Sequence, residues 1–158
     1  MLDRQYIDTL ALVYGRLAGS GVNWVLTGSL SFSIRGIPFD VHDIDIQTDR
    51  WGAYTIEKTF AAEITKKVTF VTSDMIRSHF GQLQINGLVV EIMGDIQKKR
   101  PDGSWEEPVD IDLHKQFVEV EHMLVPVLSL DYEYHAYQLL GREHVAALLR
   151  GWIDDKDA

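Results

Sequence analysis

The residues whose types and spacing most clearly allow chemistry are two aspartates, Asp43 and Asp45, in a stretch where acidic and apolar residues alternate. Side chains on a β-strand alternate between its two faces, so this spacing predicts that both carboxylates point the same way. Two neighbouring carboxylates repel each other, which raises the pKa of one of them unless a cation lies between them. Hard oxygen ligands of this kind suit Mg²⁺, which often also binds the phosphates of a substrate.

A second motif precedes the acidic pair. Gly28 and Ser29 follow the apolar segment 24–27 and stand before a short helical pattern. A Gly-Ser turn that opens a helix offers a phosphate group backbone N–H groups, a hydroxyl and the positive end of the helix. Together with the acidic pair, it predicts a site for a metal-bound nucleoside triphosphate.

A third carboxylate, Glu91, is the one charged residue in the apolar run 88–93. Burying a lone carboxylate without a partner is costly, so this side chain needs either an opposite charge or a metal ion. Glu91 is therefore the natural third ligand of the predicted metal site.

The elements that position these residues follow from hydrophobic periodicity and from turn residues. We expect helices over 3–18, 30–35 and 50–64 and strands over 23–27, 41–48 and 67–72. Asn86-Gly87 between the strand-like runs 80–85 and 88–93 favours a type I′ hairpin. Further on, we expect an exposed excursion over 101–115, a second hairpin over 116–128, and from Ser129 two helices separated by Gly141.

Composition limits the classes of protein that the chain can belong to. Its 158 residues are 46% hydrophobic and 25% charged, as in an ordinary globular domain, and the absence of cysteine excludes disulfides and thiolate zinc sites. The net charge of −9 argues against non-specific binding to DNA. The N-terminus lacks the features of a signal peptide and no apolar run is long enough to span a membrane, so we expect a cytoplasmic protein without a membrane partner.

An Asp-x-Asp pair alone is usually a solvated face, and a Gly-Ser pair alone is weaker still, but here the motifs occur in a specific order. Strand, Gly-Ser turn, short helix, Asp-x-Asp strand and a later strand with one acidic residue resemble the minimal nucleotidyltransferases of the polymerase-beta-like superfamily. The sequence is most similar to small bacterial members related to aminoglycoside and lincosamide nucleotidyltransferases. The resemblance covers residues 24–49 and the strand around Glu91.

The resemblance implies an α+β fold in which a mixed β-sheet packs on helices, with further helices at the C-terminus. We expect one nucleotidyltransferase-like domain over residues 1–158, with a core of about 20–95 and a C-terminal helical part of about 129–154. Related enzymes often carry a lysine in the C-terminal helix, where Tyr137 or Gln138 stands in this chain.

The resemblance also implies roles for the motif residues. Gly28 and Ser29 would bind the triphosphate, and Asp43 and Asp45 would ligate Mg²⁺, with two ions expected. Glu91 would complete the metal site and accept the proton of the acceptor hydroxyl. Two residues that flank these motifs are expected in the nucleotide site as well: Arg35 and His42.

The implied reaction is the transfer of a nucleoside monophosphate from a nucleoside triphosphate such as ATP to an acceptor hydroxyl, with release of pyrophosphate. The acceptor stays open between a small molecule, a protein side chain and an RNA end. The alternative is a nucleotide-binding or toxin–antitoxin-type interaction module with little or no turnover. The oligomeric state also stays open, because a small core with an exposed cleft often acquires a dimer mate or a protein partner.

Overall fold

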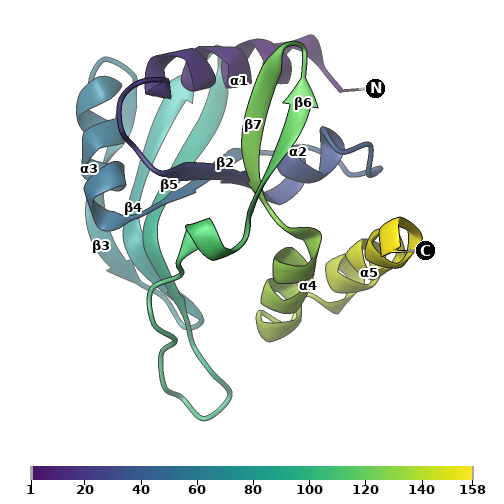
Figure 1. Ribbon diagram of the computed structural model, residues 1–158. Helices are drawn as coiled ribbons and strands as arrows, with labels where there is room; N and C mark the ends of the chain where they lie inside the picture. Colours follow the sequence, from purple (N-terminus) through teal and green to yellow (C-terminus); the bar gives the residue numbers. More distant parts are fainter. Residues whose placement is uncertain (1, 158) are drawn as a thin grey trace.

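The centre of the molecule is a mixed sheet of seven strands in the order β3-β4-β5-β2-β1-β7-β6. The computed structural model describes residues 2–157, and the side chains of residues 2–153 (Figure 1). The elements in chain order are α1 (Arg4–Leu17), β1 (Trp24–Thr27), α2 (Gly28–Ser33), β2 (Ile44–Thr48), α3 (Arg50–Thr59), β3 (Ile64–Thr72), β4 (Ile76–Ile85), β5 (Leu88–Lys98), the 3₁₀ turn η1 (Ile111–Leu113), β6 (Lys115–Val120), β7 (Met123–Leu128), α4 (Leu130–Leu139) and α5 (Glu143–Asp157).

The three central strands bring residues from distant parts of the chain into one row. β1 runs antiparallel to β2, with Thr27 opposite Asp45. β2 runs parallel to β5, with Asp45 opposite Glu91. The row Thr27–Asp45–Glu91 therefore crosses the middle of the sheet, and its side chains share one face because pairing residues point the same way.

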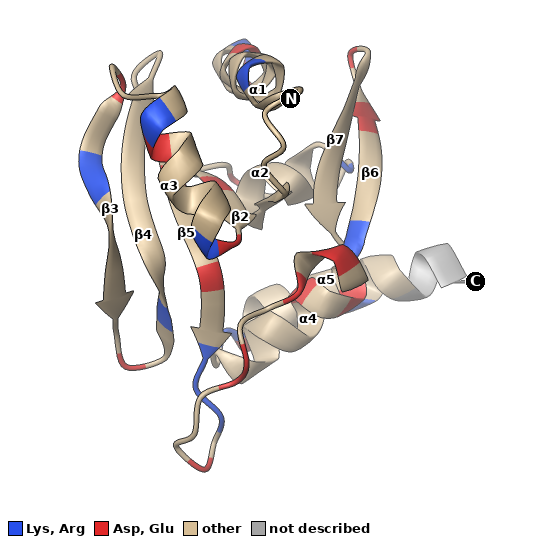
Figure 2. Cartoon of the chain, turned by 60° about the vertical axis from the view of Figure 1, so that its left-hand side comes forward, with Lys and Arg blue, Asp and Glu red and all other residues tan. Residues whose placement is uncertain are grey.

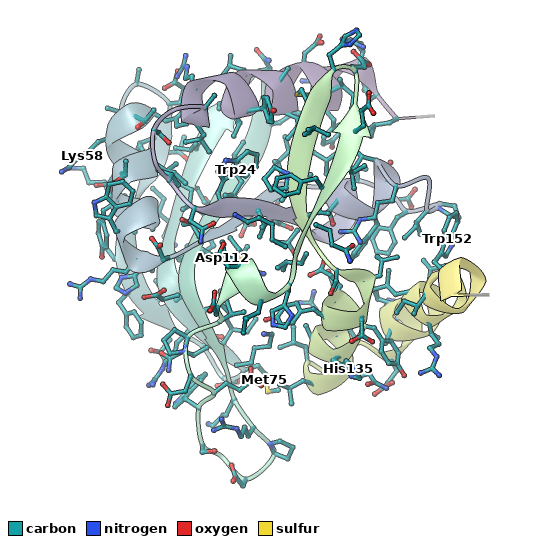
Figure 3. All side chains as sticks on the ribbon, viewed as in Figure 1. Trp24, Lys58, Met75, Asp112, His135 and Trp152 are labelled. Atoms are coloured by element: carbon teal, nitrogen blue, oxygen red, sulfur yellow. The ribbon has the colours of Figure 1, made fainter. Side chains whose placement is uncertain are left out.

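The opposite face of the sheet carries the main hydrophobic core. The neighbours of the row residues along each strand, such as Leu26, Ile46 and Ile92, are fully or almost fully buried. They pack in one cluster with apolar residues of α1 and α3, and Trp24, labelled in Figure 3, belongs to the same cluster. Period-two alternation thus buries one face of the central strands and leaves the row residues on the other.

The C-terminal helices form a separate layer. In Figure 1 α4 and α5 lie side by side at the end of the chain, coloured green and yellow. Their apolar residues cluster with Phe32 of α2 and Ile37 of the following loop. This second cluster fixes the helices beside the end of β1, where the Gly28-Ser29 turn lies.

The structure confirms the predicted α+β fold and most of the predicted elements. Asn86 and Gly87 both have positive φ angles, 53° and 76°, as the predicted type I′ turn requires. The excursion and the second hairpin are confirmed, and Gly141 separates α4 from α5 with a φ of 76°. None of the helices in the part of the chain that the structure describes is long and apolar enough to cross a membrane.

Two predicted boundaries next to the motifs were wrong. The short helix begins at Gly28 and not at residue 30, and β2 begins at Ile44 and not at residue 41. The second error has a physical cause. β1 ends at Thr27, which pairs with Asp45, so residues that precede Asp45 have no partner in β1. Asp43 therefore lies just before the strand, and strand alternation does not determine its direction.

Candidate active site

The row residues lie in a cleft of about 630 Å³ between the sheet and the C-terminal helices. Its lining residues come from the turn after β1, the segment leading into β2, the centre of β5 and the α4–α5 junction. Six of the seven residues predicted for the site line it: Gly28, Ser29, His42, Asp43, Asp45 and Glu91. The fold thus brings together motifs separated by more than sixty positions (Gly28 and Glu91).

The Gly28-Ser29 turn is held directly against the acidic residues. Gly28 has a φ of +73°, and a Cβ atom added to it would lie 2.5 Å from the Asp45 Oδ2 atom. The Ser29 Oγ atom accepts a hydrogen bond from the backbone N–H of His42 at 3.2 Å. Only glycine fits this backbone conformation beside Asp45 without strain. The hydrogen bond to the serine hydroxyl connects the Gly28-Ser29 turn to the segment that carries Asp43.

Burial and neighbouring charges raise the pKa of two of these carboxylates, Asp45 and Glu91. Burial, followed by the charges of Glu91, Asp43 and Glu133, raises the pKa of Asp45 from 3.8 to about 8, and the charge of Arg142 opposes the shift. The pKa of Glu91 is raised from 4.5 to about 7. Burial is the largest cause, followed by a hydrogen bond to Asp43 and by the charge of Asp43. Such a cluster is unfavourable in its fully ionised form unless a cation neutralises it.

This donor set fits Mg²⁺ by its chemistry. Asp43, Asp45 and Glu91 supply hard carboxylate oxygens, and their mutual repulsion would be relieved by a divalent cation. Within residues 2–153, no group of three or more histidine or acidic side chains is already drawn together as a metal cage. Mg²⁺ commonly keeps several waters and shares substrate phosphates, so a closed protein cage is not what its sites require.

A buried carboxylate that the sequence analysis missed supports the turn. Glu133 on α4 accepts a hydrogen bond from the Thr27 Oγ1 atom at 2.7 Å and another from the Gly28 backbone N–H at 3.3 Å. Its side chain is buried, which raises its pKa, while Thr27 and the charge of Arg35 act in the opposite direction. The sequence does contain a signal, because Glu133 shares a helical face with Leu130 and Tyr137 at spacings of three and four residues.

Arg35, the seventh predicted site residue, does not line the cleft. One of its guanidinium nitrogens donates a hydrogen bond to the Leu128 carbonyl, and burial lowers its pKa while the charge of Glu133 opposes that shift. The structure thus places Arg35 behind the turn, where β7 ends. Arg142, directly before α5, lines the cleft, and its charge lowers the pKa of Asp45.

Fold and cleft together define a nucleotidyltransferase-type protein, and comparisons with known proteins agree. Residues 9–149 match the family model of aminoglycoside-2''-adenylyltransferase, and the chain belongs to this family. It is also similar to the crystal structure of a candidate nucleotidyltransferase from Thermotoga maritima, with 53% sequence identity and a TM-score of 0.86 over 98% of this chain and 96% of that chain. A search among curated proteins gave no match. The predicted resemblance is confirmed.

Proposed function

We propose that the protein transfers a nucleoside monophosphate from a nucleoside triphosphate to an acceptor hydroxyl in a Mg²⁺-dependent reaction that releases pyrophosphate. The observation that carries the proposal is the register of the central strands, which puts Asp45 beside both Gly28 and Glu91. A phosphate-binding turn and three carboxylates in one cleft are the parts that phosphoryl transfer needs, since that reaction depends mainly on positioning and electrostatics.

In this proposal the acceptor oxygen attacks the α-phosphorus in line with the bond to the β-phosphate. A new O–P bond forms, the bond between the α-phosphorus and the bridging oxygen breaks, and pyrophosphate carries away the bonding electrons. Mg²⁺ held by Asp43, Asp45 and Glu91 would neutralise charge on the attacking and leaving oxygens.

The protein's own residues have distinct tasks in this step. Glu91 accepts the proton of the acceptor hydroxyl, because its carboxylate lines the same cleft as the acidic pair. Gly28 and Ser29 hold the β- and γ-phosphates, and Arg142 offers a positive charge on the opposite wall of the cleft. Since the matching family is named for an adenylyltransferase, ATP is the proposed donor.

The test is calorimetric titration of the purified protein with ATP, GTP, CTP and UTP, with and without Mg²⁺. We expect Mg²⁺-dependent binding of ATP that fails in Asp43→Asn and in Asp45→Asn, since both changes remove charge at nearly constant shape. Asp131→Asn is the matched control, because the Asp131 side chain on α4 is 74% exposed and lies outside the cleft. Failure of the wild type to bind any nucleotide, or equal binding by the two site variants, would refute the proposal.

A second candidate function is a nucleotide-binding interaction module with little turnover. The observation that favours this candidate is that Tyr137 of α4 lines the cleft, near the place where related enzymes often carry a lysine. Pyrophosphate release separates the two candidates: a protein that binds nucleotide with Mg²⁺ but releases no pyrophosphate in the presence of cell metabolites acts as a binding module.

A further inference from the structure

The cleft extends along β2 in two directions from Asp45. β1 is antiparallel to β2, so the Gly28-Ser29 turn, which follows Thr27, lies beyond Asp45 on the side of Asp43. Gln47 lies on the other side of Asp45, opposite Val25 of β1 and Met93 of β5. The lining residues on the turn side include Phe39 and Arg142, and those on the Gln47 side include Ile76 and Lys98.

Gln47 lies at the end of the cleft away from the Gly28-Ser29 turn, and one of its polar atoms lacks a hydrogen-bond partner. It stands two residues after Asp45, so both side chains lie on the same face of the sheet. Gln47 is only 7% exposed, and its buried Oε1 atom has no hydrogen-bond partner. Buried acceptors are nearly always paired in folded proteins, and this unpaired one belongs to a residue that lines the cleft.

The other walls of this end are apolar or positively charged. Ile76, Met93 and Ile96 supply the apolar surface. Lys98 is 6% exposed, and its Nζ atom donates a hydrogen bond to the Tyr132 hydroxyl at 2.7 Å and lies 3.8 Å from a carboxylate oxygen of Glu106. In Figure 2 the ribbon of β5 carries an acidic band within its length and becomes basic where the strand ends, at Lys98.

Among the residues whose side chains the structure describes, none that lines this end offers an unpaired carboxylate to a positively charged ligand. Glu106 does not line the cleft. Glu133 does, but its two oxygens accept the hydrogen bonds from Thr27 and Gly28. A ligand with several ammonium groups would therefore meet Lys98 and apolar side chains, which leave its charges unpaired at high cost.

We propose that the Gln47 end of the cleft binds the acceptor, and that the acceptor is a small hydroxyl compound with an apolar face and no positive charge. This inference rests on the proposed function, because in-line attack brings the acceptor to the side of the α-phosphorus opposite the pyrophosphate. With the β- and γ-phosphates at Gly28 and Ser29, that side faces Gln47. One hydroxyl or amide N–H of the acceptor donates to the Gln47 Oε1 atom, which makes Gln47 a specificity-determining residue.

Methyl NMR on protein labelled at the methionine methyl groups tests this inference. Met93 lines the proposed acceptor end, while Met123, buried in the main core, serves as an internal reference. The probes are a library of small hydroxyl compounds matched in size and divided into neutral, anionic and polycationic sets, added to the protein with ATP and Mg²⁺. We expect neutral or anionic compounds to shift the Met93 signal and polycationic compounds to leave it unchanged.

Gln47→Leu supplies the second arm of the test, and Gln47→Met repeats it with an unbranched side chain. Loss of the hydrogen bond should weaken binding of the same compounds on the order of tenfold while ATP binding is unchanged. Removing an unpaired buried acceptor should also raise the melting temperature, which shows that the variant is folded. Gln84→Leu, on the exposed side of β4, is the matched control and should bind like the wild type.

Preferential binding of polycationic compounds, unchanged affinity in the Gln47 variants, or a Met93 signal that no compound shifts would each overturn the inference. These results are distinguishable from failure of the proposed function. If ATP binds with Mg²⁺ and only the Met93 results fail, the acceptor assignment alone is wrong. If ATP itself does not bind, both the proposed function and the acceptor assignment are refuted.

Discussion

Asp45 on β2 lies directly opposite Glu91 on β5, and the backbone of Gly28 closes in on Asp45 from its other side. The parallel register between β2 and β5 thus holds two carboxylates together in a cleft. That arrangement is electrostatically unfavourable in the absence of a cation, because burial raises the pKa of both groups and the charge of Glu91 raises the pKa of Asp45 further. A protein selected for stability alone would not place two acidic side chains there.

The first prediction concerns the dependence of stability on pH without metal. In the folded protein the pKa of Asp45 is about 8 and that of Glu91 about 7, both above their ordinary values of 3.8 and 4.5. The folded state therefore binds more protons than the unfolded state between about pH 4 and pH 8, so the unfolding free energy falls as pH rises through this window. Urea unfolding at a series of pH values should show a loss of a few kcal/mol, since one pKa unit corresponds to about 1.4 kcal/mol.

Asp45→Asn provides the control for this experiment. The variant should lose most of the slope and be more stable than the wild type at pH 8, because the carboxamide carries no charge. Addition of Mg²⁺ at pH 8 should stabilise the wild type and leave the variant unchanged, since a ligand that binds only the folded state raises its stability. A wild type whose stability rises between pH 4 and pH 8 would contradict this account.

The second prediction concerns the fit between Gly28 and Asp45. Gly28→Ala forces a Cβ atom to within 2.5 Å of the Asp45 Oδ2 atom and places alanine at a φ of +73°. We expect the unfolding free energy to fall by about 2–4 kcal/mol and nucleotide binding to be lost. Chemical denaturation and calorimetry measure the two effects.

Gly36→Ala separates the two causes. Gly36 has a similar φ of +86°, but a Cβ atom added there meets nothing within 4 Å. This variant should therefore lose only about 1 kcal/mol and keep its nucleotide affinity. Equal losses of stability and binding in both variants would show that the contact with Asp45 has no special importance.

The third prediction concerns Glu133, which connects α4 to the Gly28-Ser29 turn. Glu133→Leu leaves the Thr27 hydroxyl and the Gly28 N–H without their partner, so the unfolding free energy should fall by about 2–4 kcal/mol. The Michaelis constant for the nucleotide should rise more than the turnover number falls, because the side chain positions the turn and does not touch the reacting atoms.

A double-mutant cycle with Thr27→Val tests the connection itself. If the hydrogen bond between Thr27 and Glu133 matters, the two changes should be non-additive by about 1 kcal/mol or more. Additive effects of the two changes would mean that Glu133 stabilises the protein without acting through the turn.

Local patterns in the sequence were enough to predict the hairpin at Asn86-Gly87 and the acidic residues Asp45 and Glu91 of the row. The position of Glu133 could not be predicted in the same way, because it depends on β7 pairing in parallel with β1 across about a hundred residues, and no local pattern encodes that pairing. The start of β2 was misplaced for a related reason. The strand-like segment in the sequence extends back to Val41, but β2 begins only where it can pair with the end of β1.

The last prediction compares two arginines: Arg35, which we expected in the nucleotide site from the sequence, and Arg142, which lines the cleft. Arg142→Met should weaken ATP binding by about tenfold at unchanged stability, since Arg142 lines the cleft and its charge acts on Asp45. Arg35→Met should leave ATP affinity within about twofold of the wild type but lower the unfolding free energy by about 1–3 kcal/mol, since it removes the hydrogen bond to Leu128 and a charge facing Glu133. Calorimetry and urea unfolding on both variants measure these effects, and the reverse pattern would return Arg35 to the nucleotide site.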